Sequence, residues 1–369
     1  MDTLNSQSNN LNRDIHQTNI KTLSADMSLF PTNPPLRLKS LQEQVIVITG
    51  ASSGIGLATA RMAAAKGANI VAAARNEDAL QQLTDELQQK GTHAVYVKAD
   101  VGREEDVIKI AKTAIQTFGR FDTWVNNAGI TIYGHAMDVT IEDMKKMFAT
   151  TFWGVVYGSR VAVKHFKEQG SPGALINVGS LFGDRGTVIQ STYAAAKFAV
   201  HGWTESIRME LAKEKAPISV TLIHPGRIDT PYNEHGKSYL NLQPAHRGML
   251  YPPQAVAEAI LHAAEYPKRD MYVGSQAKLV QLLGTLFPRT ADYLMKIIMY
   301  PTQHANRPSK PQEENALYEA GYGLKERGTN IGWRRKGSMY VKMSKHPIRS
   351  IIALGSVGFA VWALTRKKK

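Results

Sequence analysis

The sequence contains no cysteine among its 369 residues. This absence excludes disulfide bonds, thiolate metal sites and a cysteine nucleophile, although it does not identify the compartment. An apolar run near the N-terminus is also missing, so we expect no signal peptide. The histidines lack the spacing of metal ligands, and we predict no metal site at His135, His224, His235 or His246. We therefore look for a function that needs neither a cysteine thiol nor a bound metal.

Acidic residues are scarce only in the last third of the chain. Pro267 to Lys369 contains 19 basic and 6 acidic residues, whereas the preceding residues contain 26 basic and 25 acidic ones. Residues 1–40 are polar and interrupted by Pro31, Pro34 and Pro35, which predicts a flexible arm. We therefore predict an arm at 1–40, a domain at 42–274 and a basic helical or irregular extension at 275–345.

Short apolar runs alternate with helical stretches through the predicted domain. Val45–Ile48 is a β-branched run of the kind found in strands that are buried on both faces. Further strands are expected at 69–74, 94–98, 123–125, 174–178 and 218–223, and the main helices at 57–66, 103–118, 140–168 and 192–215. This alternation predicts a three-layer α/β fold with a doubly wound parallel sheet, followed by a C-terminal helical extension.

A glycine-rich loop, TGASSGIG at Thr49–Gly56, joins the first predicted strand to the first helix. Gly50 permits a tight turn, Gly54 lets the backbone approach a phosphate, and Gly56 lets the helix pack against the strand. The N-terminus of the helix would stabilise a pyrophosphate. This context favours a dinucleotide site, and a turn that binds nothing is the alternative.

No carboxylate ends the second predicted strand, where an NAD site would place one to bind the ribose hydroxyls. Arg75 stands there, and its guanidinium suits a 2′-phosphate, so we favour NADP(H) over NAD(H). A solvated surface arginine is the alternative. Asp100 follows the third strand, where it could bind the adenine amino group or cap the next helix.

Polar side chains also follow the fourth and fifth predicted strands. The segment Asn126–Gly129 suits a turn that lines a cofactor cleft, and stabilisation of the sheet by Asn126 is a compatible alternative. Ser180 follows the fifth strand. Tyr193 and Lys197 lie one turn apart on one face of the next helix, where the cation is expected to lower the pKa of the phenol. A solvated helix face is the alternative for this pair.

These motifs together resemble the short-chain dehydrogenase/reductase family, whose members have a single Rossmann domain. The resemblance covers about Gln42 to Gly274 and also includes the Pro225-Gly226…Thr230 turn. It implies that Tyr193 is the general acid/base, that Lys197 binds the ribose and tunes the pKa, and that Ser180 orients the substrate oxygen. It also implies that Ile228 and Thr230 hold the nicotinamide carboxamide.

With Arg75 included, the expected cofactor-binding residues are Gly50, Ser52, Ser53, Gly54, Ile55, Gly56, Arg75, Asp100, Val101, Asn127, Ala128, Gly129, Tyr193, Lys197, Pro225, Gly226, Ile228 and Thr230. The sequence departs from the family at Thr151, where an asparagine usually supports a water-linked proton path from the lysine. Thr151 stays among the catalytic candidates because a hydroxyl can also hydrogen-bond.

The resemblance implies an oxidoreductase that transfers hydride between the nicotinamide and a carbonyl or secondary alcohol. The substrate walls are expected in Ile130–His135, Leu181–Ile189 and Pro231–Leu250. A hydrophobic substrate is predicted from their apolar residues Tyr133, Leu181, Phe182, Val188, Ile189 and Tyr232, although these side chains could equally pack the loops. The alternative function is a non-catalytic dinucleotide-binding sensor or scaffold with the same fold.

The basic extension carries two apolar stretches. Ala277–Tyr300 has helical spacing, interrupted by Pro288, and would cap the core or lie on a membrane. Residues 350–365 are uncharged between flanking cations, which predicts a membrane anchor with the domain in the cytoplasm; a buried C-terminal helix is the alternative. The polar stretch between them shows no nucleic-acid-binding motif, and we predict no nucleic-acid partner. A homo-oligomer is compatible with the sequence.

Overall fold

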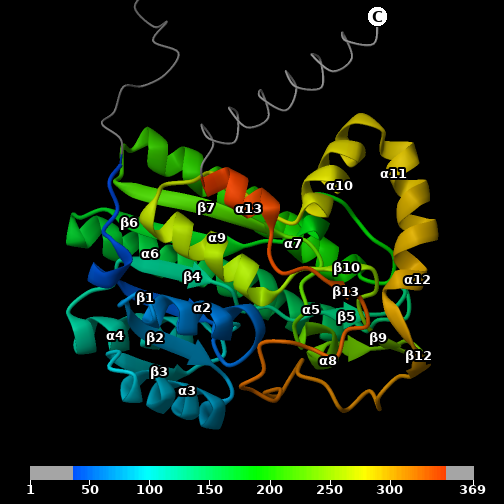
Figure 1. Cartoon of the computed structure of the whole chain (residues 1–369), viewed down its shortest axis with the longest axis horizontal. Helices are drawn as coiled ribbons and strands as arrows, with labels where there is room; N and C mark the ends of the chain where they lie inside the picture. Colours follow the sequence, from blue (N-terminus) through cyan, green and yellow to red (C-terminus); the bar gives the residue numbers. More distant parts are fainter. Residues whose placement is uncertain (1–35, 346–369) are drawn as a thin grey trace, which may run out of the picture. The chain divides into compact units, whose positions relative to one another are not determined.

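A parallel sheet of seven strands, in the order β11-β7-β6-β4-β1-β2-β3, forms the centre of the protein (Figure 1). The computed structural model describes residues 36–345, so residues 1–35 of the predicted arm and the predicted anchor at 350–365 lie outside the described part. The strands of this sheet are β1 (Val45–Thr49), β2 (Asn69–Ala74), β3 (Ala94–Lys98), β4 (Thr123–Asn126), β6 (Gly173–Val178), β7 (Ile218–Pro225) and β11 (Asp270–Val273). The doubly wound sheet predicted from the sequence is confirmed.

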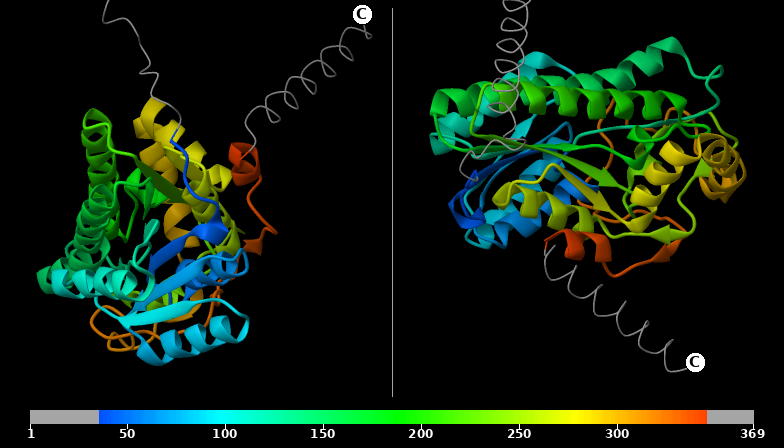
Figure 2. Two further views of the ribbon diagram at one scale, coloured as in Figure 1. Left: turned by 90° about the vertical axis from the view of Figure 1, so that its left-hand side faces the viewer. Right: turned by 90° about the horizontal axis from the view of Figure 1, so that it is seen from above.

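Alternation along β1 separates two layers of core. Ile46 and Ile48 join the cluster with α2, α3 and α9, whereas Val45 and Val47 join the cluster with α4, α6 and α7 (Figure 2). Burying each such side chain stabilises the fold by about 1.5–3 kcal/mol. These helices are α2 (Gly54–Ala64), α3 (Glu77–Gln89), α9 (Pro253–Glu265), α4 (Glu104–Phe118), α6 (Gly154–Gln169) and α7 (Ser191–Lys213).

The long helix predicted at 140–168 is interrupted by a π-helical turn. It consists of α5 (Ile141–Phe148), the turn η2 (Ala149–Trp153) and α6. Such turns widen the backbone and are frequent at functional sites. This one contains the candidate Thr151 and faces the cleft described below.

Strand order reverses between β1 and β4. Both are central and paired in parallel, but the chain continues from β1 toward β2 and β3 on one side, and from β4 toward β6 and β7 on the other. Loops that leave neighbouring strands in opposite directions open a crevice at their carboxyl ends. The candidate motifs follow these strands, so the fold brings them to one edge of the sheet.

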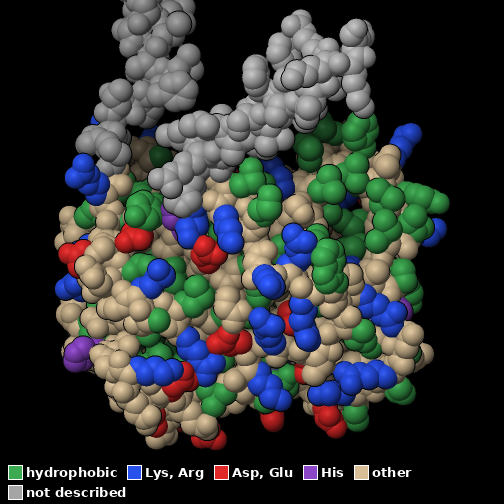
Figure 3. Space-filling view, in the orientation of Figure 1, with side chains coloured by type: hydrophobic (Ala, Val, Ile, Leu, Met, Phe, Trp, Pro, Cys, Tyr) green, Lys and Arg blue, Asp and Glu red, His purple; other side chains and the backbone are tan. Residues whose placement is uncertain are grey.

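The extension begins with helices that stand beside the sheet domain. They are α10 (Ser275–Leu286), α11 (Pro288–Leu294), the π-helical turn η4 (Met295–Met299) and α12 (Tyr300–Thr302). They bury small and flexible residues, including Ala277, Ala291 and Met295, but leave Leu279 64% and Tyr293 62% exposed. Figure 3 shows hydrophobic side chains gathered over α10 and α11. Only the inner face of these helices therefore caps the core, although capping was one expectation for the whole of Ala277–Tyr300.

The rest of the extension returns to the sheet domain. β12 (His304–Pro308) pairs with β9 (Leu242–Pro244), β13 (Trp333–Arg334) pairs with β10 (Met249–Leu250), and α13 (Met339–Lys345) packs near β11. The remaining short elements are η1 (Leu41–Glu43), β5 (Ile132–Tyr133), η3 (Leu181–Gly183), α8 (Tyr232–His235) and β8 (Lys237–Ser238). Among the helices of residues 36–345, none has both the length and the apolar character needed to cross a membrane.

Candidate active site

Two adjoining cavities form one cleft at the carboxyl ends of the central strands. The loop cavity, of about 170 Å³, is lined by the glycine-rich loop, Arg75 and Asp100. The tyrosine cavity, of about 110 Å³, is lined by Ser180, Tyr193 and Lys197. The two cavities share the lining residues Ile55, Asn127, Gly129, Thr230 and Tyr232. The fold thus brings residues from many separate stretches of sequence to one continuous site.

The glycine-rich loop and the Asn126–Gly129 turn interlock at the centre of the cleft. Gly50 has φ +67°, and a Cβ on it would lie 2.9 Å from the Ala128 Cα. A Cβ on Gly56 would lie 2.1 Å from the Gly50 carbonyl oxygen, so only glycine lets α2 begin so close to β1. Asn127 Nδ2 donates to the Thr49 carbonyl at 2.9 Å. Gly56 therefore allows the close packing of the loop but lines neither cavity.

Asn126 points into the core, away from the cleft. Its Nδ2 donates to Asn177 Oδ1 at 2.9 Å, and its Oδ1 accepts from Trp124 Nε1 at 2.7 Å. The Asn177 amide in turn donates to Thr204 on α7 at 2.9 Å. The two asparagines of the motif therefore divide the roles weighed from the sequence, because Asn126 joins β4 to β6 while Asn127 lines the cleft.

Ser180, Tyr193 and Lys197 meet in the tyrosine cavity. Ser180 leaves β6 as the first residue of a tight turn, and its Oγ accepts from the Phe182 N–H at 3.1 Å. Tyr193 and Lys197 lie on α7, with Lys197 Nζ 5.8 Å from the centre of the Tyr193 ring. Lys197 Nζ also donates to the Val178 carbonyl at 2.7 Å. All three side chains are buried, so a solvated helix face does not describe this pair.

Burial changes the acid–base properties of this group. It raises the pKa of the Tyr193 phenol, although the hydroxyls of Tyr232 and Ser180 lower it in part. Burial also lowers the pKa of Lys197 to about 8. Removal from water therefore raises the pKa of Tyr193 in this structure, and the lowering expected from Lys197 stays a prediction.

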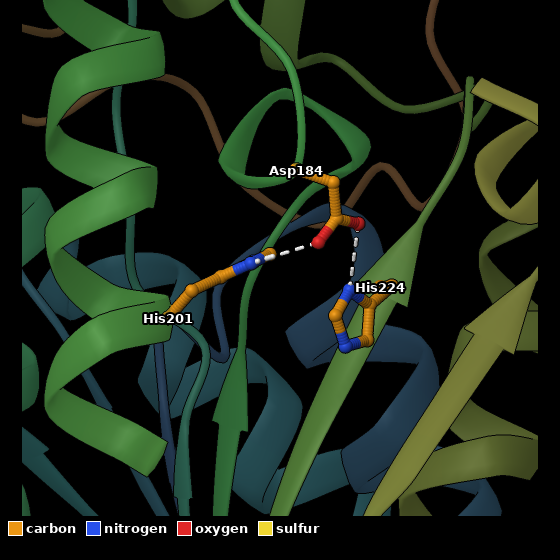
Figure 4. Close-up of side chains that lie close together, drawn as sticks. All are labelled: Asp184, His201 and His224. Carbon is orange, nitrogen blue, oxygen red and sulfur yellow. Dashed lines mark hydrogen bonds and ion pairs between the residues drawn. The ribbon is translucent and has the colours of Figure 1, made fainter. Parts of the chain in front are cut away.

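A hydrogen-bonded cluster supports the Ser180 turn from below (Figure 4). His201 Nε2 accepts from the Ser180 backbone N–H at 3.3 Å, and its Nδ1 faces Asp184 at 3.3 Å. A Cβ on Gly179 or Gly183 would lie 2.4 Å from His201 Nε2, so the imidazole fits between two glycines that flank the turn. His201 lies one helical turn beyond Lys197, and this repeat of the four-residue spacing is the signal that could have identified it.

His224 extends the cluster to β7 and β11. Its Nδ1 lies 2.9 Å from Asp184 and its Nε2 lies 3.3 Å from Asp270. Burial disfavours its charged form, but the two carboxylates outweigh burial and raise its pKa. Burial likewise opposes ionisation of Asp184, yet the hydrogen bonds from both histidines lower its pKa to about 2. Ligand atoms of Asp184, His201 and His224 lie within 4.8 Å of one another, and these bonds account for every ring nitrogen.

Thr151 bonds to the backbone of the neighbouring loop. Its Oγ1 donates to the Ile130 carbonyl at 3.1 Å and accepts from the Ile130 N–H at 3.2 Å. A Cβ placed on Gly129 would lie 3.9 Å from Lys197 Nζ and 4.0 Å from Thr151 Oγ1. Lys197 Nζ and Thr151 Oγ1 thus both lie near the side of Gly129 where a Cβ would stand, but Thr151 lines neither cavity.

Asp100 is held by a partner that the sequence did not suggest. Lys146 Nζ lies 2.8 Å from Asp100 Oδ2, and the Gly102 N–H donates to Oδ1 at 3.0 Å. Burial opposes ionisation, but these contacts outweigh it and lower the pKa of Asp100. The proposed capping of the following helix is wrong, because α4 begins after Arg103 and receives no side-chain cap.

Arg75 lies at the edge of the loop cavity and is not a free surface residue. Its Nη2 donates to the Ala316 carbonyl at 2.5 Å, and its Nη1 donates to the carbonyls of Leu317 and Tyr318 at 3.2 and 3.3 Å. The polar stretch of the extension therefore reaches the cofactor side of the cleft. Four of its residues line the loop cavity: Ala316, Ala320, Gly321 and Tyr322.

The predicted substrate loops contribute unequally. Leu181, Phe182 and Tyr232 line the tyrosine cavity, and Tyr232 meets the Tyr193 ring edge-on with centroids 5.5 Å apart. Tyr133 is buried and bonds to Asn233. Val188 is partly buried against the core cluster that includes Leu181 and Phe182, and Ile189 is buried. Arg185 pairs with Asp292 on α11 and donates to the Pro288 carbonyl, so it is no clamp for a substrate. Four residues that line this cavity were not predicted: Val178, Gly179, Gln190 and Arg227. His246 also lines it and belongs to the predicted wall Pro231–Leu250.

The remaining predicted cofactor residues line the cleft in an order that suits a dinucleotide. Ser52, Ser53, Val101 and Ala128 line the loop cavity, whereas Pro225, Gly226 and Ile228 line the tyrosine cavity. The cradle that glycine leaves at Gly50 and Gly56 provides the close backbone approach that a pyrophosphate needs. The donor set therefore fits a bound dinucleotide that extends from Arg75 to Tyr193.

Comparison with known proteins supports this interpretation. A family model described as "short chain dehydrogenase" matches residues 44–239. The chain is 70% identical over 333 residues to the Bacillus subtilis (strain 168) protein "Uncharacterized oxidoreductase YxnA", covering 90% of this chain and 93% of that protein. It is 32% identical over 257 residues to the Mycobacterium tuberculosis "Putative oxidoreductase SadH", covering 68% of this chain and 92% of the relative.

Solved structures show the same fold. A short-chain dehydrogenase/reductase from Burkholderia phymatum in complex with NAD aligns with a TM-score of 0.59 and 22% identity, covering 74% of this chain and 100% of that one. A short-chain type dehydrogenase/reductase from Mycobacterium marinum aligns with a TM-score of 0.56 and 28% identity, covering 63% and 94%. The chain therefore belongs to the short-chain dehydrogenase family and is an NAD(P)-dependent oxidoreductase.

Proposed function

We propose that this oxidoreductase transfers hydride between NADP(H) and the carbonyl or secondary alcohol of a hydrophobic substrate, with Tyr193 as general acid/base. The convergence of Ser180, Tyr193 and Lys197 in a cavity continuous with the loop cavity carries this proposal. The cofactor supplies the hydride chemistry, and the chain supplies orientation and proton transfer.

The hydrogen bonds that Ser180 and Lys197 already make support a separate role for each of them. Ser180 Oγ accepts from the Phe182 N–H, which leaves its own proton to donate to a substrate oxygen. Lys197 uses one of its three protons on the Val178 carbonyl and keeps two for ribose hydroxyls. In reduction, the neutral Tyr193 hydroxyl gives its proton to the substrate oxygen as negative charge develops there. In oxidation, the same atom accepts the proton.

A raised pKa suits Tyr193 for reduction. Because burial keeps the phenol protonated near neutral pH, it stands ready as an acid. Lys197, with a pKa of about 8, changes charge in the range where oxidation would require a phenolate. Thr151 acts only indirectly in this scheme, by fixing the Ile130 loop beside Gly129.

Arg75 supports the preference for NADP(H). Among the described residues, it is the only arginine that lines the loop cavity, and the carbonyl oxygens around its guanidinium carry negative partial charge. Asp100 is fixed by Lys146 at the same end, where it would meet the adenine amino group. Ile228 and Thr230 lie at the opposite end, where we assign them to the nicotinamide carboxamide.

The walls of the tyrosine cavity support a hydrophobic substrate with one polar contact. Leu181, Phe182 and Tyr232 provide apolar surface close to Tyr193. His246 also lines this cavity, is buried, and has an Nδ1 without a hydrogen-bond partner among the described residues. Burial lowers the pKa of His246 to about 3, so it would meet a substrate as a neutral hydrogen-bonding group.

A panel of carbonyl compounds, assayed with NADPH and with NADH, tests the proposal. Reduction of apolar ketones or aldehydes, faster with NADPH at equal concentration, is the expected outcome. Tight binding of either dinucleotide without turnover of any substrate would instead favour a dinucleotide sensor. A preference for small charged substrates would contradict the assignment of the substrate class.

We also propose that residues 350–365, which lie outside the described residues, attach the protein to a membrane. The cations between Lys342 and Arg349 and those from Arg366 to Lys369 would contact lipid headgroups. The exposed apolar side chains of α10 and α11 provide a second surface suited to a bilayer. Deleting residues 350–369 should move the protein from the membrane fraction to the supernatant after cell lysis, and an unchanged distribution would refute the proposal.

A further inference from the structure

Part of the C-terminal extension crosses the cofactor side of the cleft. We name residues 316–330 the strap. Between β12 and β13 the chain has no regular secondary structure, and in Figure 1 this orange stretch passes below α8, approaches α3 and returns. Leu317 at its start and Asn330 at its end are buried against the domain. The strap is therefore a fixed part of the described structure rather than a loose loop.

The strap occupies the donors that a dinucleotide would use. The Gly54 N–H, at the N-terminus of α2, donates to the Lys325 carbonyl at 2.9 Å. The Leu324 N–H donates to the Ser52 carbonyl at 2.8 Å, which holds the strap on the glycine-rich loop. At the other side of the loop cavity, the Arg75 guanidinium faces three strap carbonyls. Both groups are positions where the fold favours phosphate.

Further contacts hold the strap at its edges. Tyr322 donates to Glu234 at 2.5 Å, and the Thr329 N–H donates to the same carboxylate at 2.6 Å. Glu326 forms an ion pair with Arg61 at 2.8 Å. Asn330 Nδ2 donates to Asp229 Oδ1 at 3.1 Å. These partners lie on α2 and on the loop around α8, so they hold the strap across the mouth of the cleft.

Glycine lets the strap lie close to the domain. A Cβ on Gly323 would lie 2.2 Å from the Ala79 Cβ, and a Cβ on Gly328 would lie 2.3 Å from the Thr230 carbonyl oxygen. Gly337, farther along the same extension, has nothing within 4 Å of that position. A larger residue at position 323 would therefore lift the strap, whereas the same change at position 337 would not.

We propose that the strap is a lid that competes with the cofactor, and that NADP(H) opens it by displacing strap carbonyls from Gly54 and Arg75. The proposal rests on the proposed cofactor and adds a conformational step to its binding. A carbonyl oxygen carries a partial negative charge, whereas a phosphate carries a full charge and forms stronger hydrogen bonds to the same donors. The phosphate groups of the cofactor therefore displace the carbonyls. Because only molecules with an open lid can bind, the apparent affinity for the cofactor falls in proportion to the fraction of molecules that are open.

The lid also distinguishes the two dinucleotides. A 2′-phosphate would reach the Arg75 guanidinium and release all three of its carbonyl partners, whereas a free ribose hydroxyl carries no charge with which to displace them. A pyrophosphate would act only on the Gly54 end. The strap is thus expected to move farther with NADPH than with NADH.

A dye on the strap tests the movement directly. Because the chain has no cysteine, Glu319→Cys on the exposed part of the strap provides a single labelling position. Fluorescence of the labelled full chain should change on addition of NADPH or of adenosine 2′,5′-bisphosphate, and change less with NADH. A signal that stays constant while NADPH binding saturates would overturn the lid.

Association kinetics test the competition. Gly323→Val should raise the NADPH association rate about tenfold and lower the Kd, because fewer molecules begin with the lid closed. Glu326→Ala, which removes the ion pair with Arg61 and the hydrogen bond from Gln254, should act in the same direction with a smaller effect. Gly337→Val is the matched control and should bind as the parent does. Slower association or a higher Kd in both strap variants would show that the strap is a wall of the site that helps to retain NADPH. That outcome would refute the proposal that the strap competes with the cofactor.

Two outcomes separate this proposal from the proposed function. If neither dinucleotide binds, the assignment of the cofactor fails. If NADPH binds and supports turnover while the label and both strap variants behave as the control does, the cofactor assignment stands and the lid is wrong.

Discussion

The two cavities of the cleft are enclosed in different ways. Residues of the sheet domain wall the tyrosine cavity, and they come mainly from α7 and from the segments that follow β6 and β7. The loop cavity has a comparable floor, but the C-terminal strap contributes the opposite wall. One end of the site is thus built within the predicted domain, whereas the other also requires a segment more than 200 residues from the glycine-rich loop.

This difference separates the residues that would take part in the reaction from those that would affect how the cofactor binds. The tyrosine cavity holds groups whose identity matters, because a phenol, a hydroxyl and an ammonium perform different tasks. The strap contacts the loop cavity mainly through main-chain carbonyls, which act as acceptors whatever the side chain is. Variants in the tyrosine cavity should therefore affect catalytic rate, and variants at the loop cavity should affect cofactor affinity and its kinetics.

The largest effect is expected at Tyr193. Tyr193→Phe removes the proton donor but keeps the ring, so kcat should fall by roughly 10²–10⁴-fold. The Kd for NADPH, measured by fluorescence titration, should change little because the phenol hydroxyl acts on the substrate. A variant that keeps most of its activity would show that another group transfers the proton.

Arg75 tests the opposite end of the cleft. Arg75→Ala should weaken NADPH relative to NADH by roughly 10- to 100-fold, the range for a lost charge-assisted hydrogen bond. The ratio of the two Kd values is the appropriate measure, because removing Arg75 also loosens the strap and affects both dinucleotides. Rate constants at saturating cofactor should stay near those of the parent. Equal weakening of both dinucleotides would contradict the assignment of the 2′-phosphate.

A smaller effect is expected from His201, which contacts the Ser180 turn rather than the substrate. His201→Ala should lower kcat about tenfold, because small displacements of a positioned group slow catalysis. The NADPH Kd should be retained, and His201→Gln, which keeps an acceptor for the Ser180 N–H, should recover part of the rate. The exposed His93→Ala is the control. Loss of cofactor binding in parallel with kcat would indicate general unfolding instead of a positioning role.

The smallest effect is an acid-dependent loss of stability through Asp184. Its folded-state pKa of about 2 is below the ordinary value of 3.8, so its ionisation stabilises the fold above about pH 4. That contribution, about 1–2 kcal/mol with allowance for partial exposure, is lost as the pH falls from 4 toward 2. Urea unfolding at about pH 5 and about pH 3 should therefore show a steeper loss of unfolding free energy in the parent than in Asp184→Asn. Parallel losses would contradict the shifted pKa.

The sequence predicted the fold well because its signals are local. Strands such as Asn69–Ala74 and helices such as α4 follow from apolar runs and periodicity, and their observed bounds differ little from those predicted. Gly50 and Gly56 could be assigned for the same reason, because only glycine permits their backbone geometry. The kink at η2, by contrast, has no clear sequence signal, and 140–168 was predicted as one helix.

Long-range partners explain what the sequence did not predict. Asp100 was expected to bind adenine or cap a helix, but its nearest charged partner, Lys146, is 46 residues away. The pKa of Tyr193 was expected to fall beside Lys197, but burial raises it in this structure. Neither the ion pair nor the burial depth can be read from neighbouring residues.

The sequence by itself determined the order of the sheet elements, the glycine-rich loop, and the presence of Ser180, Tyr193 and Lys197 at matching positions. These features depend on residue type and short spacing, which the chain carries directly. Only the tertiary structure placed His201 beneath Ser180 and brought the strap onto Gly54 and Arg75. The physical reason is that these contacts involve backbone groups or a buried ring, whose partners are set by how the whole chain packs.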